Sequence, residues 1–300
     1  WLKAPLHGTE LIMLVHACTL GALIAHVAGL SHSRHQDLEL LDPDSEFEVT
    51  ISARGGSPVD PHGRAARDDS DSGRFWVNES FCLNFLHIPK TGGTTVESAR
   101  LNGSPEASRW GAHDQNLRCS GMTSCGSSAP TLSKPRCCPM KDGSRCPVWH
   151  TPPSADAELE NSYRPCDTFC IVRNPAARFR SQFVWSAPQE GVPEPWCTTE
   201  SLKKAVDRKL ESLKTTPYQN ACHYVPQTEF WAEGRGCQHI VKQENFVKDF
   251  TALMHEFDLD FNIKRKHIST SCEADFDPES LRKLQEYYAA DYAAFNYSLA

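Results

Sequence analysis

A short apolar stretch followed by a glycine-rich turn is the feature that most constrains how this chain of 300 residues folds. Phe81 to Ile88 reads FCLNFLHI, a run suited to a buried strand. Pro89 to Gly93 interrupts the run, and Thr94 and Glu97 then stand at the spacing of a helix capping box. A strand, a tight turn and a helix in this order are typical of an α/β fold, in which helices cover the faces of a sheet.

The turn contains residue types that bind anions. Backbone N–H groups between a strand and a helix converge on one point, and the positive end of the helix dipole strengthens the field there. Glycine lets the backbone come close to an anion, threonine offers a hydroxyl donor, and lysine adds a cation. A phosphate or sulfate site is therefore predicted, with these candidate binding residues: Lys90, Thr91, Gly92, Gly93, Thr94 and Thr95.

A second strand and helix follow further along the chain. Thr168 to Val172 is an apolar strand, and Asn174-Pro175 opens a helix that extends to about Ser186, with proline at a position where its missing N–H does no harm. Arg173 offers a planar fork of donors to a phosphate. Ser181 lies two helical turns further on and can donate to the same group. These residues predict a second phosphate-binding position.

The order of lysine and glycine decides between classes of nucleotide. A Walker A loop of kinases and ATPases has its lysine after the glycines. Here Lys90 precedes Gly92 and Gly93, the segment contains no Gly-Lys-Thr, and no convincing magnesium-binding acidic motif accompanies it. These features disfavour a P-loop nucleotide kinase, which is kept as an alternative.

Both motifs resemble those of a known family. HIPKTGGTT, from His87 to Thr95, resembles the 5′-phosphosulfate loop of Golgi carbohydrate sulfotransferases, particularly the heparan sulfate 2-O- and 6-O-sulfotransferase group. IVRNPAARFRSQF is similar to that family's 3′-phosphate motif, in which a serine follows the arginine by eight positions, as Ser181 follows Arg173. A weaker resemblance covers roughly residues 80 to 300 and includes His223–Gln227, Glu244–Phe246 and Asp291–Tyr297.

The resemblance implies a P-loop-like sulfotransferase fold, with a central parallel sheet and flanking helices. It also implies 3′-phosphoadenosine 5′-phosphosulfate as co-substrate and in-line transfer of its sulfuryl group to an acceptor hydroxyl. By analogy with phosphoryl transfer, Lys90 would stabilise charge on the departing phosphate oxygen while the loop N–H groups hold the other oxygens. The residues present require no metal.

A general base must take the proton of the acceptor, and histidine is the usual residue near neutral pH. His150 lies 23 positions before Arg173 (173 − 150 = 23), and the 2-O-sulfotransferase branch carries its catalytic histidine at about that distance from the same motif. We therefore expect His150 to be the base. His113 and His223 are the alternatives, and His87 is expected to be a structural part of the loop.

The cysteines and glycosylation sequons indicate the secretory pathway. Cys18 lies in the apolar N-terminal segment, and the other 12 of the 13 cysteines follow it, an even number that predicts disulfide bonds. Sequons at Asn78, Asn102 and Asn296 fit a glycoprotein. A cysteine-rich insert at about 102–153 is expected to be pinned by disulfides, and its cysteine spacing does not suit a zinc site.

The N-terminal part divides into an apolar and a polar segment. Leu11 to Leu30 contains no Asp, Glu, Lys or Arg and has the ~20 residues that a membrane-spanning helix needs, so residues 1–30 are expected to form a signal anchor. A signal peptide is the alternative, although no clear small-residue cleavage site follows. Residues 31–74 are polar with few aromatics, which predicts a disordered stem. The catalytic domain is expected over 75–300.

These features together predict a single-pass type II protein of the Golgi membrane, with a lumenal α/β domain that sulfates a hydroxyl of a glycan or polysaccharide. The formal net charge of −7 means that anion binding must come from local arrangement, and nothing in the composition suggests a nucleic-acid partner. A protein-tyrosine sulfotransferase is the alternative within the family. A non-catalytic secreted binding module is the alternative outside the enzymes.

Overall fold

The computed structural model describes most of the chain from residue 48 onward. The described residues are 48–51, 68–69, 74–78, 81–97, 99–101, 110, 117–125, 136–192, 194–231, 236–264 and 272–299. All of them belong to one compact unit, Asp42–Ala300.

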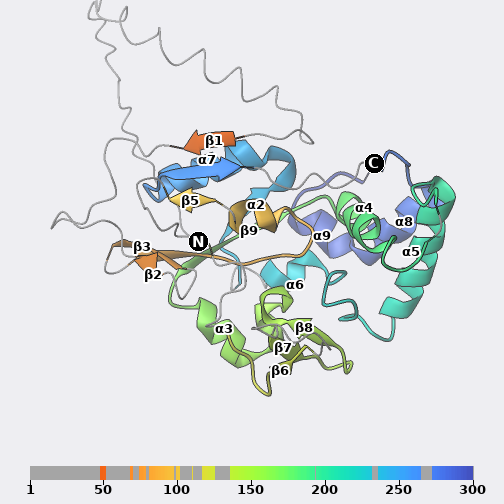
Figure 1. Cartoon of the computed structure of the whole chain (residues 1–300), viewed down its shortest axis with the longest axis horizontal. Helices are drawn as coiled ribbons and strands as arrows, with labels where there is room; N and C mark the ends of the chain where they lie inside the picture. Colours follow the sequence, from red (N-terminus) through yellow and green to blue (C-terminus); the bar gives the residue numbers. More distant parts are fainter. Residues whose placement is uncertain are drawn as a thin grey trace, which may run out of the picture. The chain divides into compact units, whose positions relative to one another are not determined.

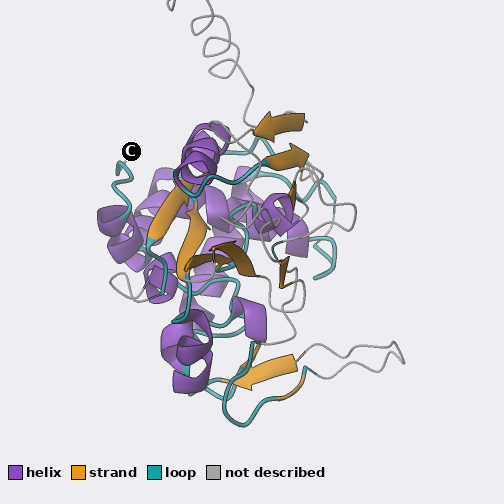
Figure 2. Cartoon of the chain, turned by 90° about the vertical axis from the view of Figure 1, so that its left-hand side faces the viewer, coloured by secondary structure: helices purple, strands orange, loops and turns teal. Residues whose placement is uncertain are grey.

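A five-stranded sheet forms the centre of this unit, in the order β10-β9-β4-β3-β2 (Figure 1). Its strands are β2 (Asp68–Asp69), β3 (Arg74–Asn78), β4 (Phe81–Phe85), β9 (Asp167–Val172) and β10 (His239–Lys242). The strands β10, β9 and β4 run parallel, while β3 pairs antiparallel with both β4 and β2. Helices lie on either side of these strands (Figure 2). The predicted α/β class with parallel strands between helices is confirmed.

Both faces of β9 are buried. Successive side chains of a strand point to opposite faces, and here Phe169 and Ile171 join one apolar cluster while Cys170 and Val172 join another. This explains why Phe169 to Val172 is a continuous apolar run with no polar alternation, as expected of a parallel strand covered on both sides.

Eight α-helices are described. They are α2 (Gly93–Glu97), α3 (Ala157–Tyr163), α4 (Pro175–Ser186), α5 (Thr199–Leu213), α6 (Gln227–Trp231), α7 (Phe246–Glu256), α8 (Pro278–Tyr287) and α9 (Ala289–Ala294). The side chain of Asn174 accepts hydrogen bonds from the N–H groups of Ala176 and Ala177, so α4 begins at Pro175, where the sequence predicts it.

Two helical patterns of the sequence differ in extent from the observed helices. The pattern from Pro278 to Phe295 predicts a single helix, which the structure divides at Tyr288; this residue leaves helical geometry and donates its hydroxyl to the carbonyl of Tyr224. The apolar spacing from about Lys242 to Phe257 predicts another helix, which in the structure begins at Phe246. Lys242 instead ends β10, because pairing with β9 is a tertiary interaction that helical periodicity does not reveal.

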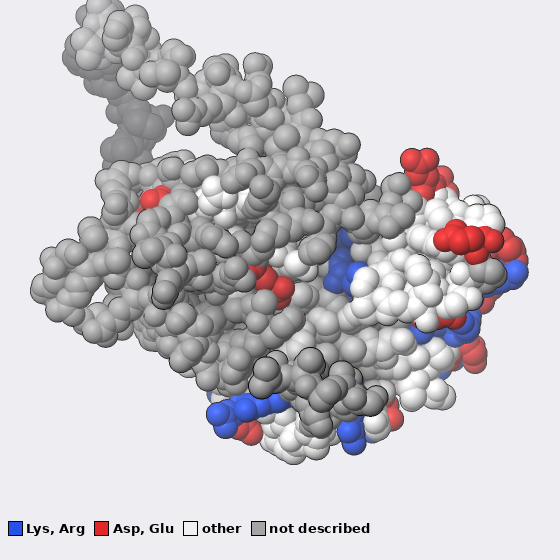
Figure 3. Space-filling model, viewed as in Figure 1, with Lys and Arg blue, Asp and Glu red and all other residues white. Residues whose placement is uncertain are grey.

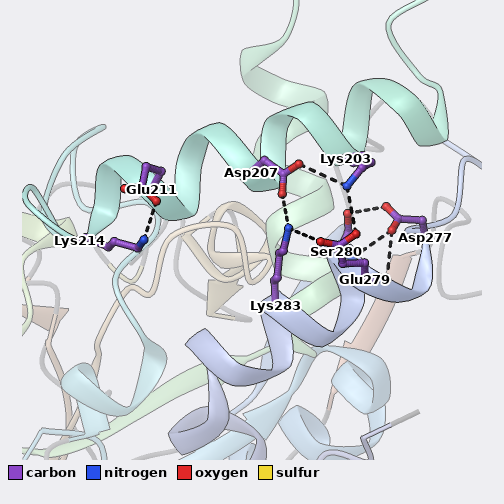
Figure 4. Close-up of polar contacts among 8 residues, drawn as sticks. All are labelled: Lys203, Asp207, Glu211, Lys214, Asp277, Glu279, Ser280 and Lys283. Carbon is purple, nitrogen blue, oxygen red and sulfur yellow. Dashed lines mark hydrogen bonds and ion pairs between the residues drawn. The ribbon is translucent and has the colours of Figure 1, made fainter.

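Helices α5 and α8 pack beside α4 and carry a small charge network on their outer side (Figure 4). Lys283 of α8 lies 2.7 Å from a carboxylate oxygen of Asp207 on α5 and 2.7 Å from one of Glu279. The hydrogen bond from Lys283 lowers the pKa of Asp207. Because these side chains are at least partly exposed to solvent, each pair contributes little to stability. The buried apolar side chains of Leu202, Val206 and Leu284 hold the helices together.

Two small sheets accompany the central one. One has the order β1-β11-β5, with β1 (Glu48–Ile51), β11 (Phe261–Lys264) and β5 (Arg100–Leu101). The other has the order β6-β7-β8 within the cysteine-rich insert, with β6 (Thr123–Ser124), β7 (Arg136–Pro139) and β8 (Arg145–Pro147).

Strands β1 and β2 lie within residues 31–74, where the composition predicts a disordered stem. At these positions the structure therefore differs from the expectation. Composition misses such a strand because the β-branched Val49, Thr50 and Ile51 obtain their pairing from β11, more than 200 residues away.

All twelve cysteines after Cys18 form disulfides, so the predicted disulfide-bonded character is confirmed. The pairs are Cys82–Cys166, Cys119–Cys138, Cys125–Cys137, Cys146–Cys222, Cys170–Cys237 and Cys197–Cys272. Two pairs lie within the insert. The pair Cys146–Cys222 joins the insert to the segment that precedes α6.

The predicted membrane anchor at 1–30, including Leu11 to Leu30, lies outside the described residues. In the part of the chain that the structure describes, no helix is both long and apolar enough to cross a membrane.

Candidate functional site

Three loops meet where the parallel strands end. Parallel strands place their carboxyl ends at one edge of a sheet, and open α/β sheets bind ligands in the crevice outside that edge. The loop after β4 contains Lys90, the loop after β9 contains Arg173, and the turn after β10 begins at Gln243. A β-carbon added to Gly92 would lie 3.6 Å from Cγ of Gln243, so the first and third loops touch.

The loop after β4 has a backbone that glycine makes possible. Gly92 has φ +98° and Lys90 has φ +69°, both in the left-handed region. A β-carbon on Gly93 would lie 2.7 Å from the ring of His87, so this position has no room for a side chain. Thr91 is fully buried, and its hydroxyl donates to the carbonyl of Ile88 at 2.8 Å. Thr91 therefore shapes the loop, whereas Gly92 and Thr94 are exposed.

One face of α4 organises the site. Arg178, Ser181, Gln182 and Trp185 are spaced i, i+3, i+4 and i+7, which places them along one side of a helix. Of these four residues, only Ser181 is predicted from the sequence as part of the site. The helical spacing of three polar side chains followed by a tryptophan is the signal that could have revealed the other three.

Buried Arg178 connects α4 by hydrogen bonds to the loop after β4 and to the segment before α6. Its Nε donates to the carbonyl of Pro89 at 2.9 Å, Nη1 to that of Val225 at 2.8 Å and Nη2 to that of His223 at 3.0 Å. Only 2% of the residue is exposed. A guanidinium presents its donors in a rigid fork, so Arg178 fixes the loop after β4 relative to α4 and to His223.

Lys90 and Arg173 bring two positive charges to the same edge of the central sheet. Burial lowers the pKa of Lys90 to about 8, and the charge of Arg173 acts in the same direction. Neighbouring positive charges repel each other, which disfavours the protonated form of Lys90. An anion that binds between or beside the two side chains stabilises both charges. Figure 3 shows Lys or Arg atoms recessed between the surrounding atoms near the middle of one face.

The backbone of Arg173 is held by a glutamine. Gln227 accepts from the N–H of Arg173 at 2.9 Å and donates to its carbonyl at 2.8 Å. Buried Asp291 in turn accepts from the N–H groups of Gln227 and Thr228, each at 2.9 Å. Asn174 donates its N–H to Glu244 at 2.7 Å. The segments of weaker resemblance, including Gln227, Glu244 and Asp291, thus gather around the end of β9.

Three histidine rings form a row beside Lys90. The ring centroids of His87 and His150 are 5.1 Å apart, and those of His150 and His223 are 4.7 Å apart. Nδ1 of His87 lies 2.6 Å from Glu97, and Nδ1 of His223 lies 2.7 Å from Oε1 of Gln182. His150 comes from the insert, on the short 3-10 helix η1 (Val148–His150). His113 lies outside the described residues.

The surroundings of His223 make it a poor base. Burial lowers its pKa to about 3, and the charges of Lys90 and Arg178 act in the same direction. A base with so low a pKa gives little driving force for proton removal near neutral pH. His150 is half-buried, and its ring lies between those of His87 and His223. Of the three histidines, it is the one that belongs to the insert.

Ser181 lies on α4 one turn before Trp185 and is half-buried. Thr95 is half-buried at the start of α2, where its N–H donates to the carbonyl of Gly92 at 3.0 Å. Among the described residues, no group of three or more His, Cys, Asp or Glu is arranged to hold a metal ion.

Comparisons with protein-family models, with curated proteins and with solved structures gave no match to this chain.

Proposed function

We propose that this protein is a sulfotransferase that moves the sulfuryl group of 3′-phosphoadenosine 5′-phosphosulfate to a hydroxyl of a glycan. The observation that carries the proposal is the meeting of Lys90 and Arg173 at the carboxyl ends of two parallel strands, where burial and the charge of Arg173 lower the pKa of Lys90 to about 8. This co-substrate carries phosphate groups at both its 5′ and its 3′ end, so it suits a site with two separate cations.

The residues divide between the two ends of the nucleotide. Lys90, the loop N–H groups and the hydroxyls of Thr94 and Thr95 would hold the phosphosulfate. Arg173 and Ser181, on the next strand and its helix, would hold the 3′-phosphate. Thr91 would contribute indirectly, because its hydroxyl already donates to Ile88.

The transfer is a substitution at sulfur. The acceptor oxygen forms a bond to sulfur while the bond from sulfur to the bridging phosphate oxygen breaks, and that oxygen keeps the electron pair. Lys90 stabilises the negative charge that develops there. His150 takes the proton of the acceptor hydroxyl, since His223 is too weak a base and the ring of His87 is packed against Gly93 of the loop.

The placement of the insert bears on the binding-module alternative. The insert is bonded to the core by Cys146–Cys222, and it puts His150 against His223 next to the anion loop. An insert that only bound a partner elsewhere would not need a histidine beside the anion-binding loop. The kinase alternative lacks support at the loop, where the lysine precedes both glycines.

Substitution of the two cations tests the proposal. We expect Lys90→Ala and Arg173→Ala each to abolish transfer of labelled sulfate to an oligosaccharide panel, and to weaken binding of adenosine 3′,5′-bisphosphate in calorimetry by tenfold or more. Lys204→Ala, which removes an exposed lysine of α5, is the matched control and should change neither value.

The same titrations separate the alternatives. Magnesium-dependent binding of ATP in preference to the bisphosphate would identify a kinase, and binding of neither nucleotide would support a non-catalytic module. Transfer to tyrosine peptides instead of saccharides would identify a protein-tyrosine sulfotransferase. Wild-type activity in both variants would refute the assigned site.

A further inference from the structure

Trp185 is unusual among the described residues. It is the last but one residue of α4, and 49% of it is exposed. Among the described residues only one other large apolar side chain, Leu299, is exposed. Single exposed apolar residues are common on proteins and carry no meaning by themselves, so the position of Trp185 in the site decides whether its exposure matters.

The indole lies beside the groups that are expected to act on the sulfuryl. Nζ of Lys90 is 5.2 Å from the centroid of the Trp185 ring, and the His223 ring is 5.4 Å away. Ser181 and Gln182 precede Trp185 by four and three residues, so they share its side of α4. Trp185 therefore borders the row of histidines and is itself exposed.

Helix α4 carries groups of both ends of the expected nucleotide site. Arg173 precedes its first residue, Pro175, and Ser181 lies one turn before Trp185. A nucleotide with its 3′-phosphate at Arg173 and Ser181 and its sulfuryl at Lys90 would have its reactive end beside Trp185, because Nζ of Lys90 lies 5.2 Å from the centroid of that ring.

We propose that Trp185 is the platform on which the acceptor places the sugar ring that carries the reacting hydroxyl. This inference rests on the proposed function and deepens it, because it names a saccharide-binding residue on the acceptor side. The face of an indole is electron-rich and attracts the C–H groups of a pyranose ring. The cation of Lys90 near the ring helps to hold the indole in place.

A saccharide fits this position better than a protein partner does. A stable protein interface buries about 800 Å² on each side, and one exposed indole offers only part of that area. A sugar ring matches one aromatic face in size. A sugar on the indole would also lie beside His223, whose ring contacts that of His150.

The test measures how variants of the full chain bind three unsulfated hexasaccharides, which are derived from chondroitin, heparosan and β-1,4-galactan. Trp185→Ala removes the platform, Trp185→Phe keeps an aromatic face, and Leu299→Ala is the matched exposed apolar control. Binding of each hexasaccharide is followed by calorimetry and saturation-transfer NMR in the absence of donor. Binding of adenosine 3′,5′-bisphosphate, KM for the saccharide and kcat are measured in parallel.

We expect Trp185→Ala to weaken saccharide binding and to raise its KM by tenfold or more. The affinity for adenosine 3′,5′-bisphosphate and the kcat at saturating saccharide should stay within twofold of wild type. Trp185→Phe should fall between the two, and Leu299→Ala should match wild type. Circular dichroism and thermal melting check that each variant is folded.

Other outcomes overturn the inference. Loss of bisphosphate affinity with unchanged saccharide affinity would show that the indole contacts the nucleotide instead. Equal saccharide binding by wild type and Trp185→Ala, or binding by neither, would also overturn it. If wild type binds no bisphosphate, the proposed function fails, yet saccharide binding that is lost in Trp185→Ala would still support the platform.

Discussion

At the scale of single residues, Lys90 says most about the kind of ligand that the site binds. Its backbone has φ +69°, a conformation that residues other than glycine rarely adopt. Its side chain is half-buried, and its ammonium group lies close to a second cation. Holding a half-buried positive charge near a second one costs free energy in the ligand-free protein, and a bound anion reduces this cost. The site therefore favours a negatively charged ligand.

The titration of Lys90 predicts how donor affinity depends on pH. Only the protonated ammonium attracts the anion, and burial with the charge of Arg173 lowers the pKa of Lys90 to about 8. The affinity for adenosine 3′,5′-bisphosphate should therefore be nearly constant between pH 6.5 and 7.5. It should fall as the pH rises through 8, by up to about tenfold per pH unit.

Calorimetry across pH 6.5 to 9.5 measures this dependence. Lys90→Arg is the matched variant, because an arginine stays protonated throughout this range. We expect the variant to lose the decline above pH 8 even if its affinity is lower overall. The same decline in both proteins would place the titrating group elsewhere.

At the scale of elements, two segments bring the histidines together. Asn220, Ala221 and Cys222 all have φ between +54° and +64°, so they form a left-handed turn directly before His223. Left-handed backbone costs residues with a β-carbon roughly 1–2 kcal/mol each. The carboxamide of Asn220 accepts from Lys209 at 2.8 Å, and Cys222 is bonded to Cys146 of the insert. These contacts hold the turn in place.

The insert is expected to supply the base. We expect His150→Ala to bind adenosine 3′,5′-bisphosphate like wild type and to lose at least about a hundredfold in kcat, within the range typical of general-base catalysis. His255→Ala, which removes a half-buried histidine at the end of α7, is the control and should keep its kcat. Near-normal turnover of His150→Ala would show that another group takes the proton.

At the scale of the whole molecule, the disulfides connect distant parts of the chain. Cys82–Cys166 and Cys170–Cys237 tie strands of the central sheet to neighbouring segments, and Cys146–Cys222 ties the insert to the site. A disulfide stabilises mainly by restricting the unfolded chain, and longer loops gain more. The cross-links therefore serve both stability and the geometry of the site.

Reducing agent should lower the melting temperature measured by differential scanning calorimetry. Two double variants separate stability from geometry. Replacing Cys146 and Cys222 by alanine opens a loop of 76 residues and should lower both stability and kcat. Replacing Cys125 and Cys137 opens a loop of 12 residues, and the entropy model makes its cost in stability about 1.6 kcal/mol smaller.

The second double variant should keep kcat near wild type, because its disulfide closes a loop within the insert and does not join the insert to the segment of His223. A melting temperature that reductant leaves unchanged would contradict a stabilising role for the cross-links. Equal loss of kcat in both double variants would contradict the role of Cys146–Cys222 in placing the histidines.

The sequence by itself determined the local units of this protein. The apolar run at β9, the cap at Asn174 and the proline at the start of α4 act on neighbouring residues, so their pattern predicts a strand followed by a helix. Likewise, the even number of cysteines indicated a disulfide-bonded domain. The anion loop with Lys90 was also predicted, because its residue types lie within a few positions of one another.

Only the tertiary structure decided which distant side chains meet. Arg178 binds the carbonyls of Pro89 and Val225, 89 and 47 residues away in the chain, and these contacts depend on how α4 lies against the strand ends. The partner of each cysteine, the row of His87, His150 and His223, and the exposure of Trp185 depend on the same packing. Helical spacing can show that Arg178 and Trp185 share one side of α4, but no local pattern specifies which distant residues they meet.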